Sequence, residues 1–271
     1  MAKSEGVDLE FAIVDKINID NNKQKKYSRP YSSAIQSQST KCVDHIYKFA
    51  GNKNVMCWHS DDSSGPYGSI SANPEPKTDI ILKIGSTVYK TSVKMAGPVQ
   101  LASGQGESSA ILFESAAKMT SNANKSKVLK SIITELKTMP TKLLSEQNKK
   151  RILTESNPKI INEFIKGGKI IKDKSYELWM QSNKEILMKS MLEYMDKDPE
   201  FFNALLYESL TGESSLAKYR GASADRIISP NGFYKINAAY VASIKSKVKF
   251  DIRGKSRGGI SSIAFRIDLR G

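Results

Sequence analysis

The chain has 271 residues, and 42 lysines and arginines against 28 acidic residues give it a formal net charge of +14. With 39% hydrophobic residues spread along the sequence, its composition excludes wholesale disorder, and no apolar run approaches the ~20 residues that a membrane span needs. A charge of this sign attracts polyanions. We therefore expect DNA as the partner and no contact with a membrane; the alternatives are a surplus of charge that serves solubility and a partner that has an acidic surface. The oligomeric state stays open, and a homodimer is one alternative.

Two features of the sequence bear on its location. Cys42 and Cys57 are the only cysteines and form no zinc-binding pattern. The first residues, MAKSEGVDLE, lack the apolar segment of a signal peptide. Together they predict a soluble, cytoplasmic protein in a reducing compartment.

The first elements are a short segment and a helix. Residues 1–30 open with an apolar stretch and pass into a polar, basic stretch that ends in proline, which predicts an N-terminal segment followed by a mobile arm. In residues 31–50, apolar side chains recur at helical spacing, and Gly51 is placed to end that helix.

The next region, up to residue 123, alternates strands and turns before it returns to a helix. Residues 54–60, 78–85 and 87–95 have the composition and length of strands, and the last two are joined by a turn at Gly85 and Ser86. Residues 108–119 then favour a helix. We expect the order helix, three strands, helix in residues 31–123.

The rest of the chain is predicted to be a helical region over 124–222, followed by C-terminal strands over 223–271. The helices break at Pro140, before Pro158 and at Gly167-Gly168, and further helices cover residues 174–195 and 201–212. Strands at 226–229 and 233–236 and a hairpin around residues 256–259 complete the pattern. The predicted fold class is α/β, with a mixed central sheet, flanking helices, a helical insertion and a C-terminal β-hairpin.

The most informative residues lie between positions 76 and 100. Asp79 begins one predicted strand, and Lys94 lies near the end of the next, so a tight turn brings the two side chains to one end of the sheet. Ser92 and Lys94 point to the same face because side chains alternate along a strand. A carboxylate beside a lysine can hold a hard divalent cation and stabilise charge on a phosphate.

This arrangement resembles the PD-(D/E)XK nuclease superfamily, whose core is a helix, three strands, a helix and another strand. The matching pieces are Pro76-Lys77-Thr78-Asp79, Thr91-Ser92-Val93-Lys94 and Gln100 in GPVQLASG, within about residues 31–120. The resemblance implies Asp79 and the backbone carbonyl of Val93 as metal ligands. It also implies Lys94 as the residue that orients water or stabilises the phosphorane, and Gln100 as a polar residue at the entrance of the next helix.

One position departs from that family, which has Asp or Glu where this chain has Ser92. Either another acid replaces it, with Glu107, Asp44 and Glu208 as candidates, or the site binds DNA without cutting it. Glu208 lies among leucines and is either a surface residue or a buried acid recruited to the site. Glu107 is also explained by its place in the first turn of a helix.

Basic residues gather in two places that suit contacts with a phosphate backbone. Arg253, Lys255 and Arg257 lie in the predicted C-terminal hairpin, between glycines that permit close approach. The predicted arm carries Lys25, Lys26 and Arg29, of the kind that become ordered on DNA.

The two histidines offer weaker chemistry. His59 precedes Asp61 and Asp62 in a predicted loop, where it could bind a metal or act as a general base. His45 lies on a predicted helix and is more simply structural.

The sequence therefore predicts a DNA-binding protein that acts as a Mg²⁺- or Mn²⁺-dependent endodeoxyribonuclease, with Asp79, Ser92, Lys94 and Gln100 in the site. A non-catalytic DNA-binding or virion-packaging protein with a nuclease-like fold is the alternative. A protein-binding module with a basic surface is a third.

Overall fold

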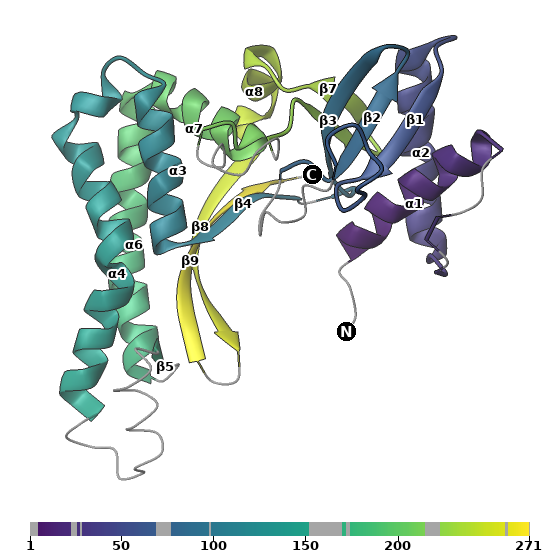
Figure 1. Ribbon diagram of the computed structural model, residues 1–271. Helices are drawn as coiled ribbons and strands as arrows, with labels where there is room; N and C mark the ends of the chain where they lie inside the picture. The colour runs from purple at the N-terminus through teal and green to yellow at the C-terminus, as the bar shows by residue number, and fades with distance from the viewer. Residues whose placement is uncertain are drawn as a thin grey trace. The chain divides into compact units, whose positions relative to one another are not determined.

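The computed structural model describes residues 5–22, 26–27, 29–68, 77–97, 99–151, 170–171, 174–214, 223–257 and 260–270 (Figure 1). The chain forms two compact units, and each combines separate stretches of sequence. Unit 1 contains Met1–Val99, Tyr207–Lys247 and Arg270–Gly271. Unit 2 contains Gln100–Leu206 and Val248–Leu269. These units differ from the predicted regions, each of which is one continuous stretch of the chain.

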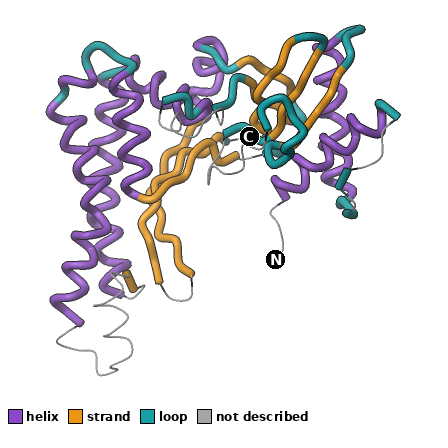
Figure 2. The backbone as a smooth tube through the Cα atoms, in the orientation of Figure 1, coloured by secondary structure: helices purple, strands orange, loops and turns teal. Residues whose placement is uncertain are grey.

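Unit 1 is built on a five-stranded mixed sheet in the order β1-β2-β3-β6-β7 (Figure 2). The strands are β1 Val55–His59, β2 Ile80–Ile84, β3 Thr87–Val93, β6 Arg226–Ser229 and β7 Gly232–Lys235. Neighbouring strands are antiparallel, except that β3 and β6 are parallel. The predicted α/β class with a mixed sheet is confirmed, and every predicted strand of this sheet is present.

Two helices precede the sheet and share a core with it. Helix α1 covers Glu5–Asp20 and α2 covers Ser33–Ala50. Ser32 caps α2 by accepting a hydrogen bond from the Ile35 amide at 3.3 Å, and Gly51 ends it with φ of 59°, a conformation that glycine adopts without strain. The predicted helix over residues 31–50 is therefore confirmed, whereas α1 extends well beyond the apolar stretch expected there.

The core of unit 1 forms between these helices and the sheet. Its members are largely aliphatic and include Leu9, Ile13, Val14, Ile17, Ile35, Val43, Ile46, Val55, Ile80, Leu82, Ile84 and Val93. The cysteines are part of it: both are free, and burial raises the pKa of Cys42 to about 12. Close packing of these side chains fixes the position of the two helices against the sheet.

Residues 26–31 are anchored on α1 through one buried carboxylate. Asp15 is 2% exposed and accepts hydrogen bonds from the Lys26 amide at 2.8 Å, the Tyr27 amide at 2.9 Å and the Tyr31 hydroxyl at 2.7 Å. Burial and the bond to Asp15 raise the pKa of Tyr31. The described part of the predicted arm is therefore a strap fixed to the first helix.

Replacing Asp15 with Ala should lower the free energy of unfolding by about 3 kcal/mol, because three donors lose a charged acceptor in a site closed to water. Urea denaturation measures the change. Asp20→Ala is the matched control, since Asp20 lies on the same helix and is partly exposed, where its loss should cost less than ~1 kcal/mol. Equal losses in the two variants would contradict the assignment of Asp15 as the anchor.

Unit 2 contains long helices and a second sheet. Its elements are β4 Val99–Gln105, α3 Gly106–Lys118, η1 Ala123–Lys125, α4 Lys127–Arg151, β5 Ile170–Ile171, α6 Lys174–Lys197, β8 Val248–Arg257 and β9 Ile260–Leu269. Helix α4 packs against both α3 and α6. The sheet has the order β4-β9-β5, and β8 pairs with β9 as the expected C-terminal hairpin.

Two local predictions in this region were wrong. Pro140 does not end its helix, because α4 continues to Arg151. A proline inside a helix costs about 3 kcal/mol, and the burial of Leu136 and Met139 beside it offsets this cost through packing. Residues 99–105 form β4 instead of the expected helix entrance. The predicted breaks at Pro158 and Gly167-Gly168 lie outside the described residues.

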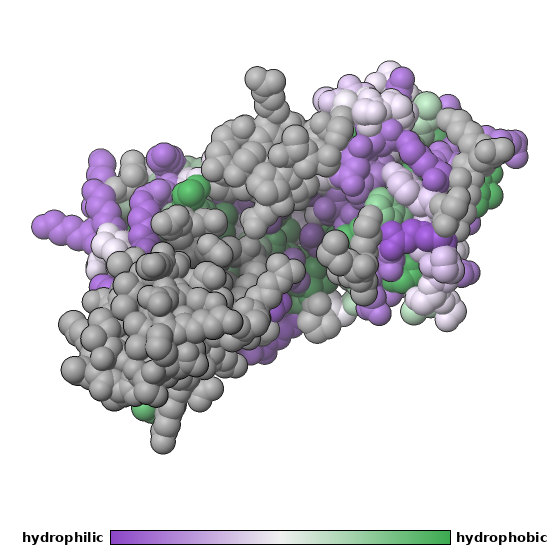
Figure 3. Space-filling model, turned by 60° about the horizontal axis from the view of Figure 1, so that its bottom comes forward, coloured by the Kyte–Doolittle hydropathy of each residue, from purple (hydrophilic) through white to green (hydrophobic). Residues whose placement is uncertain are grey.

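Of the remaining elements, one helix crosses from unit 2 into unit 1, and two short helices of unit 1 precede β8. Helix α7 covers Pro199–Thr211, and α8 covers Ala238–Ile244 and runs into η3, Lys245–Lys247. No helix in the described ranges is both long enough and apolar enough to cross a bilayer. On the face shown in Figure 3, hydrophilic residues cover much of the described surface, with smaller hydrophobic patches between them.

Candidate functional site

Asp79 lies at the entrance of β2, and its backbone already belongs to the sheet. Its amide donates to the Thr91 carbonyl, and its carbonyl accepts from the Ser60 amide, both at 3.0 Å. The carboxylate is directed at the end of β3: Oδ2 accepts from Ser92 Oγ at 3.0 Å and from the Val93 amide at 2.7 Å. Two donors on one oxygen hold this side chain in a single direction.

Lys94 follows directly after these contacts. Its amide donates to the Ile228 carbonyl at 2.8 Å, which continues the parallel pairing of β3 with β6. In the described part of the chain, neither the Lys94 ammonium nor Oδ1 of Asp79 has a hydrogen-bond partner. The Asp79 carboxylate is therefore bound to the amide of the residue just before Lys94, at one end of the sheet.

A third ionisable group, Glu10 of α1, bonds to His59, which pairs with Ile80, the residue after Asp79. Burial raises the pKa of Glu10, and the charges of Asp79 and Lys94 act on it in opposite directions. Glu10 therefore lies within electrostatic range of both residues. Since burial and Asp79 disfavour its ionised form, a cation bound between the two carboxylates would relieve that cost.

His59 ends β1 and contacts Glu10. Its Nε2 lies 3.0 Å from Oε2 of Glu10, and its Nδ1 accepts a hydrogen bond from the Asp61 amide at 3.1 Å. The ring is buried and lies 4.5 Å from the ring of Phe11, between centroids. His59 is the last residue of the strand expected over residues 54–60, and the loop with Asp61 and Asp62 follows it.

The other predicted site residues are more scattered. Ser92 is 2% exposed and serves Asp79 as a donor. Gln100 is exposed on β4 and belongs to unit 2, and Asp44 is exposed on α2. Glu107 falls in the first turn of α3, as expected, and its side chain lies outside the described parts.

Glu208 is not the surface residue that one interpretation of the sequence favoured. It is fully buried in α7, and its carboxylate accepts from the Ser214 amide at 2.9 and 3.1 Å. This contact satisfies an amide just beyond the helix end, so the carboxylate has a structural role there.

The predicted basic arm is held by acids of its own unit. Lys26 forms an ion pair with Asp62, and Arg29 forms one with Asp8. Burial alone would raise the pKa of Asp62, but hydrogen bonds from Lys26 and Ser64 outweigh it and lower that pKa. Lys25 lies outside the described residues.

The predicted basic hairpin is described by its backbone alone. Arg253, Lys255 and Arg257 occupy alternate positions of β8, opposite Ala264, Ser262 and Ile260 of β9. Their side chains lie outside the described parts of the structure.

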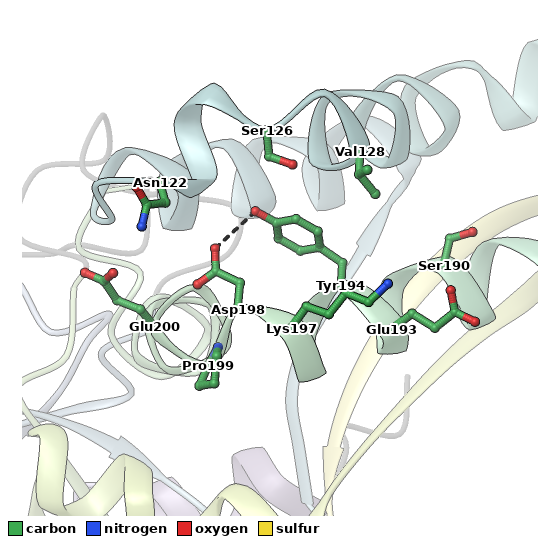
Figure 4. Close-up of a pocket in the computed structure, with 10 residues that line it drawn as sticks. All are labelled: Asn122, Ser126, Val128, Ser190, Glu193, Tyr194, Lys197, Asp198, Pro199 and Glu200. Atoms are coloured by element: carbon green, nitrogen blue, oxygen red, sulfur yellow. Dashed lines mark hydrogen bonds between the residues drawn. The ribbon is translucent and has the colours of Figure 1, made fainter.

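A pocket of about 610 Å³ in unit 2 contains none of the predicted site residues (Figure 4). At its centre the Tyr194 hydroxyl donates to Asp198 Oδ2 at 3.1 Å, and the other oxygen of Asp198 accepts from the Phe201 amide at 3.0 Å. Asp198 therefore caps α7. These contacts give Tyr194 and Asp198 structural roles in the pocket.

The donor set at the sheet end suits a hard divalent cation. Glu10 and Asp79 offer carboxylate oxygens, and Mg²⁺ commonly binds one or two carboxylates while it keeps several waters and takes substrate phosphates as further ligands. Within the described residues there is no group of three or more His, Cys, Asp or Glu side chains that could hold a metal ion. The residues thus fit a cation that shares its ligands with a substrate.

Comparisons of the chain with protein-family models, with curated proteins and with solved structures found no match.

The sequence analysis missed Glu10, although the sequence carries a signal for it. In a helix, positions i+3, i+4 and i+7 share a face with residue i, and for Glu10 these are Ile13, Val14 and Ile17, all fully buried. A charged residue on the core-facing stripe of a helix needs a partner or a function. That test would have selected Glu10 once residues 5–20 were assigned as a helix.

Proposed function

We propose that this protein binds DNA and hydrolyses its phosphodiester bonds with the help of a divalent cation held by Glu10 and Asp79. The observation that carries the proposal is that Asp79 is held by the backbone next to Lys94, while Glu10 bonds to His59, the strand partner of the residue after Asp79. Glu10 then replaces the acid that is missing at Ser92. Mg²⁺ and Mn²⁺ are the cations expected for such oxygen ligands.

The order of elements in unit 1 supports the resemblance to PD-(D/E)XK nucleases. Helices α1 and α2 come first, β1, β2 and β3 follow, and after α7 the strand β6 pairs with β3 in parallel. Within unit 1 this follows the implied order of helix, three strands, helix and strand if the end of α7 is the second helix; the helix expected at residues 108–119 is α3 and belongs to unit 2. Much of the sequence between β3 and α7 belongs to unit 2, as an insertion would.

In the proposed reaction each residue has a limited task. A bound cation would supply a water of lowered pKa and would neutralise charge on the phosphate. Ser92 and Val93 hold Asp79 in place through the two bonds to Oδ2. Lys94 places a positive charge where negative charge develops on the phosphoryl oxygens.

The binding half of the proposal rests on charge. A net charge of +14 implies release of counterions from the DNA backbone, so affinity should fall steeply as salt rises. With Lys26 and Arg29 engaged in ion pairs, we favour the hairpin residues Arg253, Lys255 and Arg257 as the phosphate contacts.

A second function is favoured by one observation. The hydroxyl of Ser92 occupies the space beside Asp79 where the family has an acid, which leaves the cation fewer charged ligands. A DNA-binding protein that has lost catalysis, such as a virion or packaging component, fits this loss. It would bind DNA with the same dependence on salt and would cut none.

The test is incubation of supercoiled, linear double-stranded and single-stranded DNA with Mg²⁺, Mn²⁺ or EDTA. We expect cleavage by the wild type with a divalent cation and none in EDTA. Asp79→Asn keeps an acceptor for Ser92 and Val93 but loses the charge, so cleavage should stop. Asp44→Asn makes the same change at an exposed position of α2 and should cut at the wild-type rate.

DNA affinity is measured in EDTA on the same proteins at several salt concentrations. Unchanged salt-dependent binding in Asp79→Asn separates lost chemistry from lost binding. If the wild type binds DNA in this way but cuts no substrate with either cation, the non-catalytic function holds and the nuclease proposal is wrong.

A further inference from the structure

The contact between His59 and Glu10 places a buried imidazole behind a carboxylate of the proposed site. The His59 side chain is 6% exposed and that of Glu10 is 15% exposed. The two groups come from different elements, because His59 ends β1 and Glu10 lies in the middle of α1. Their bond is therefore a tertiary contact that depends on the packing of the helix against the sheet.

Two groups of Asp61 lie near Nδ1 of His59, and the amide is the closer, since Oδ2 lies 3.6 Å away. A backbone amide can only donate, so the Asp61 amide at 3.1 Å requires a lone pair on Nδ1. The neutral ring then has its hydrogen on Nε2, which donates to Oε2 of Glu10 at 3.0 Å. The turn after β1 thereby selects the tautomer that binds Glu10.

Aromatic packing limits the rotation of the ring. The centroid of His59 lies 4.5 Å from that of Phe11 and 6.2 Å from that of Tyr27, which meets it edge-on. Tyr27 is in turn fixed by Asp15 through its amide. The imidazole is thus held by α1, by the strap and by its own turn.

We propose that His59 is a positioning residue that fixes the Glu10 carboxylate for a divalent cation. One oxygen of Glu10 is bound to Nε2, and the other is then directed by a rigid support. The inference rests on the proposed function, in which Glu10 and Asp79 share the cation. Hydrogen bonds to a ligating carboxylate commonly change metal affinity about 10- to 100-fold.

A hydrogen bond from His59 lowers the entropy cost that Glu10 meets when it binds a cation. An unsupported glutamate has to lose the freedom of several rotatable bonds when it binds a metal. A carboxylate already fixed by a neutral donor avoids most of that loss and keeps its negative charge for the cation. A purely structural histidine would contribute to folding and leave metal affinity unchanged.

The experiment measures binding of Mn²⁺ alone, without DNA, by titration calorimetry on the full chain. His59→Gln retains an amide N–H at about the reach of Nε2, whereas His59→Asn is too short to reach Glu10. We expect Asn to weaken Mn²⁺ binding by about 10- to 100-fold and Gln to stay within about threefold of the wild type. Thermal unfolding in EDTA gives the stability of each variant.

The pair of variants keeps the inference testable if one of them is less stable, because affinity is compared at a temperature where both are folded. Equal Mn²⁺ affinity in the Asn, Gln and wild-type proteins overturns the positioning role, whatever happens to the melting temperature. Equal losses in Asn and Gln overturn it as well. Glu10→Gln is measured beside them: if it binds Mn²⁺ as the wild type does, the cation is not at Glu10 and the proposed function itself is wrong.

Discussion

Replacing Glu10 with Gln is expected to lower the rate of metal-dependent DNA cleavage by about 10³-fold, since a lost ligand charge removes several kcal/mol of transition-state stabilisation. Gln keeps the shape of the side chain and an oxygen that accepts from His59 Nε2, so the fold should be retained. DNA affinity in EDTA should be unchanged or higher, because one charge that repels phosphate is gone. Initial cleavage rates and fluorescence anisotropy measure the two effects.

The matched control is Glu5→Gln, the same chemical change on the same helix. Glu5 is exposed in the first turn of α1, where a carboxylate contributes only about 0.3–1 kcal/mol through the helix dipole. This variant should cut DNA at the wild-type rate. Cleavage by Glu10→Gln at the same rate as Glu5→Gln would exclude Glu10 from the reaction.

Replacing Ser92 with Asp should make the stability of the protein depend on divalent cations. The Ser92 side chain is 2% exposed and lies 3.0 Å from Asp79 Oδ2, so the new carboxylate would face an existing one in a nearly closed space. In EDTA we expect a loss of about 3–5 kcal/mol, the usual cost of an uncompensated buried charge. Mg²⁺ or Mn²⁺ should restore most of it, because a ligand that binds only the folded state stabilises that state.

Ser92→Asn separates charge from size in this experiment. Asn has the same shape as Asp, so any steric cost is shared, and it carries no charge. The melting temperature of the Ser92→Asn protein should change little on addition of Mg²⁺, whereas that of Ser92→Asp should rise by more than in the wild type. Identical melting curves for both variants with and without the cation would show that position 92 does not face a metal site.

Local patterns predicted most of the fold of unit 1, because its strands are short, apolar and separated by turns. Gly51 follows α2 and Gly85 follows β2, and both have a positive φ. Glycine adopts this conformation readily, so its position in the sequence indicates where such an element ends. Pro140 was misjudged for the opposite reason. Its effect on α4 depends on the burial of the flanking residues, and burial is a property of the folded chain.

The candidate site was predictable only in part, because some of its residues are brought together by local sequence spacing and others by tertiary contacts. Asp79, Ser92 and Lys94 lie on neighbouring strands joined by a tight turn, so sequence spacing alone places them together. His59 comes to the same region through the pairing of β1 with β2, and Glu10 through the packing of α1 on the sheet; both depend on contacts between residues far apart in the sequence. Likewise, the acids that pair with Lys26 and Arg29 come from other parts of the chain. The sequence alone therefore overstated how available this basic stretch is for contacts with DNA phosphates.

The parallel pairing of β3 with β6 also sets the order in which the site can form during synthesis. The ribosome makes Glu10, Asp79 and Lys94 early, but the carbonyl that holds the Lys94 amide belongs to Ile228, in a strand that begins at Arg226. A nascent chain therefore carries all three side chains long before the strand beside Lys94 exists. Any shortened product that ends before Arg226 would contain the same three residues without the strand that pairs with β3 and fixes one of them.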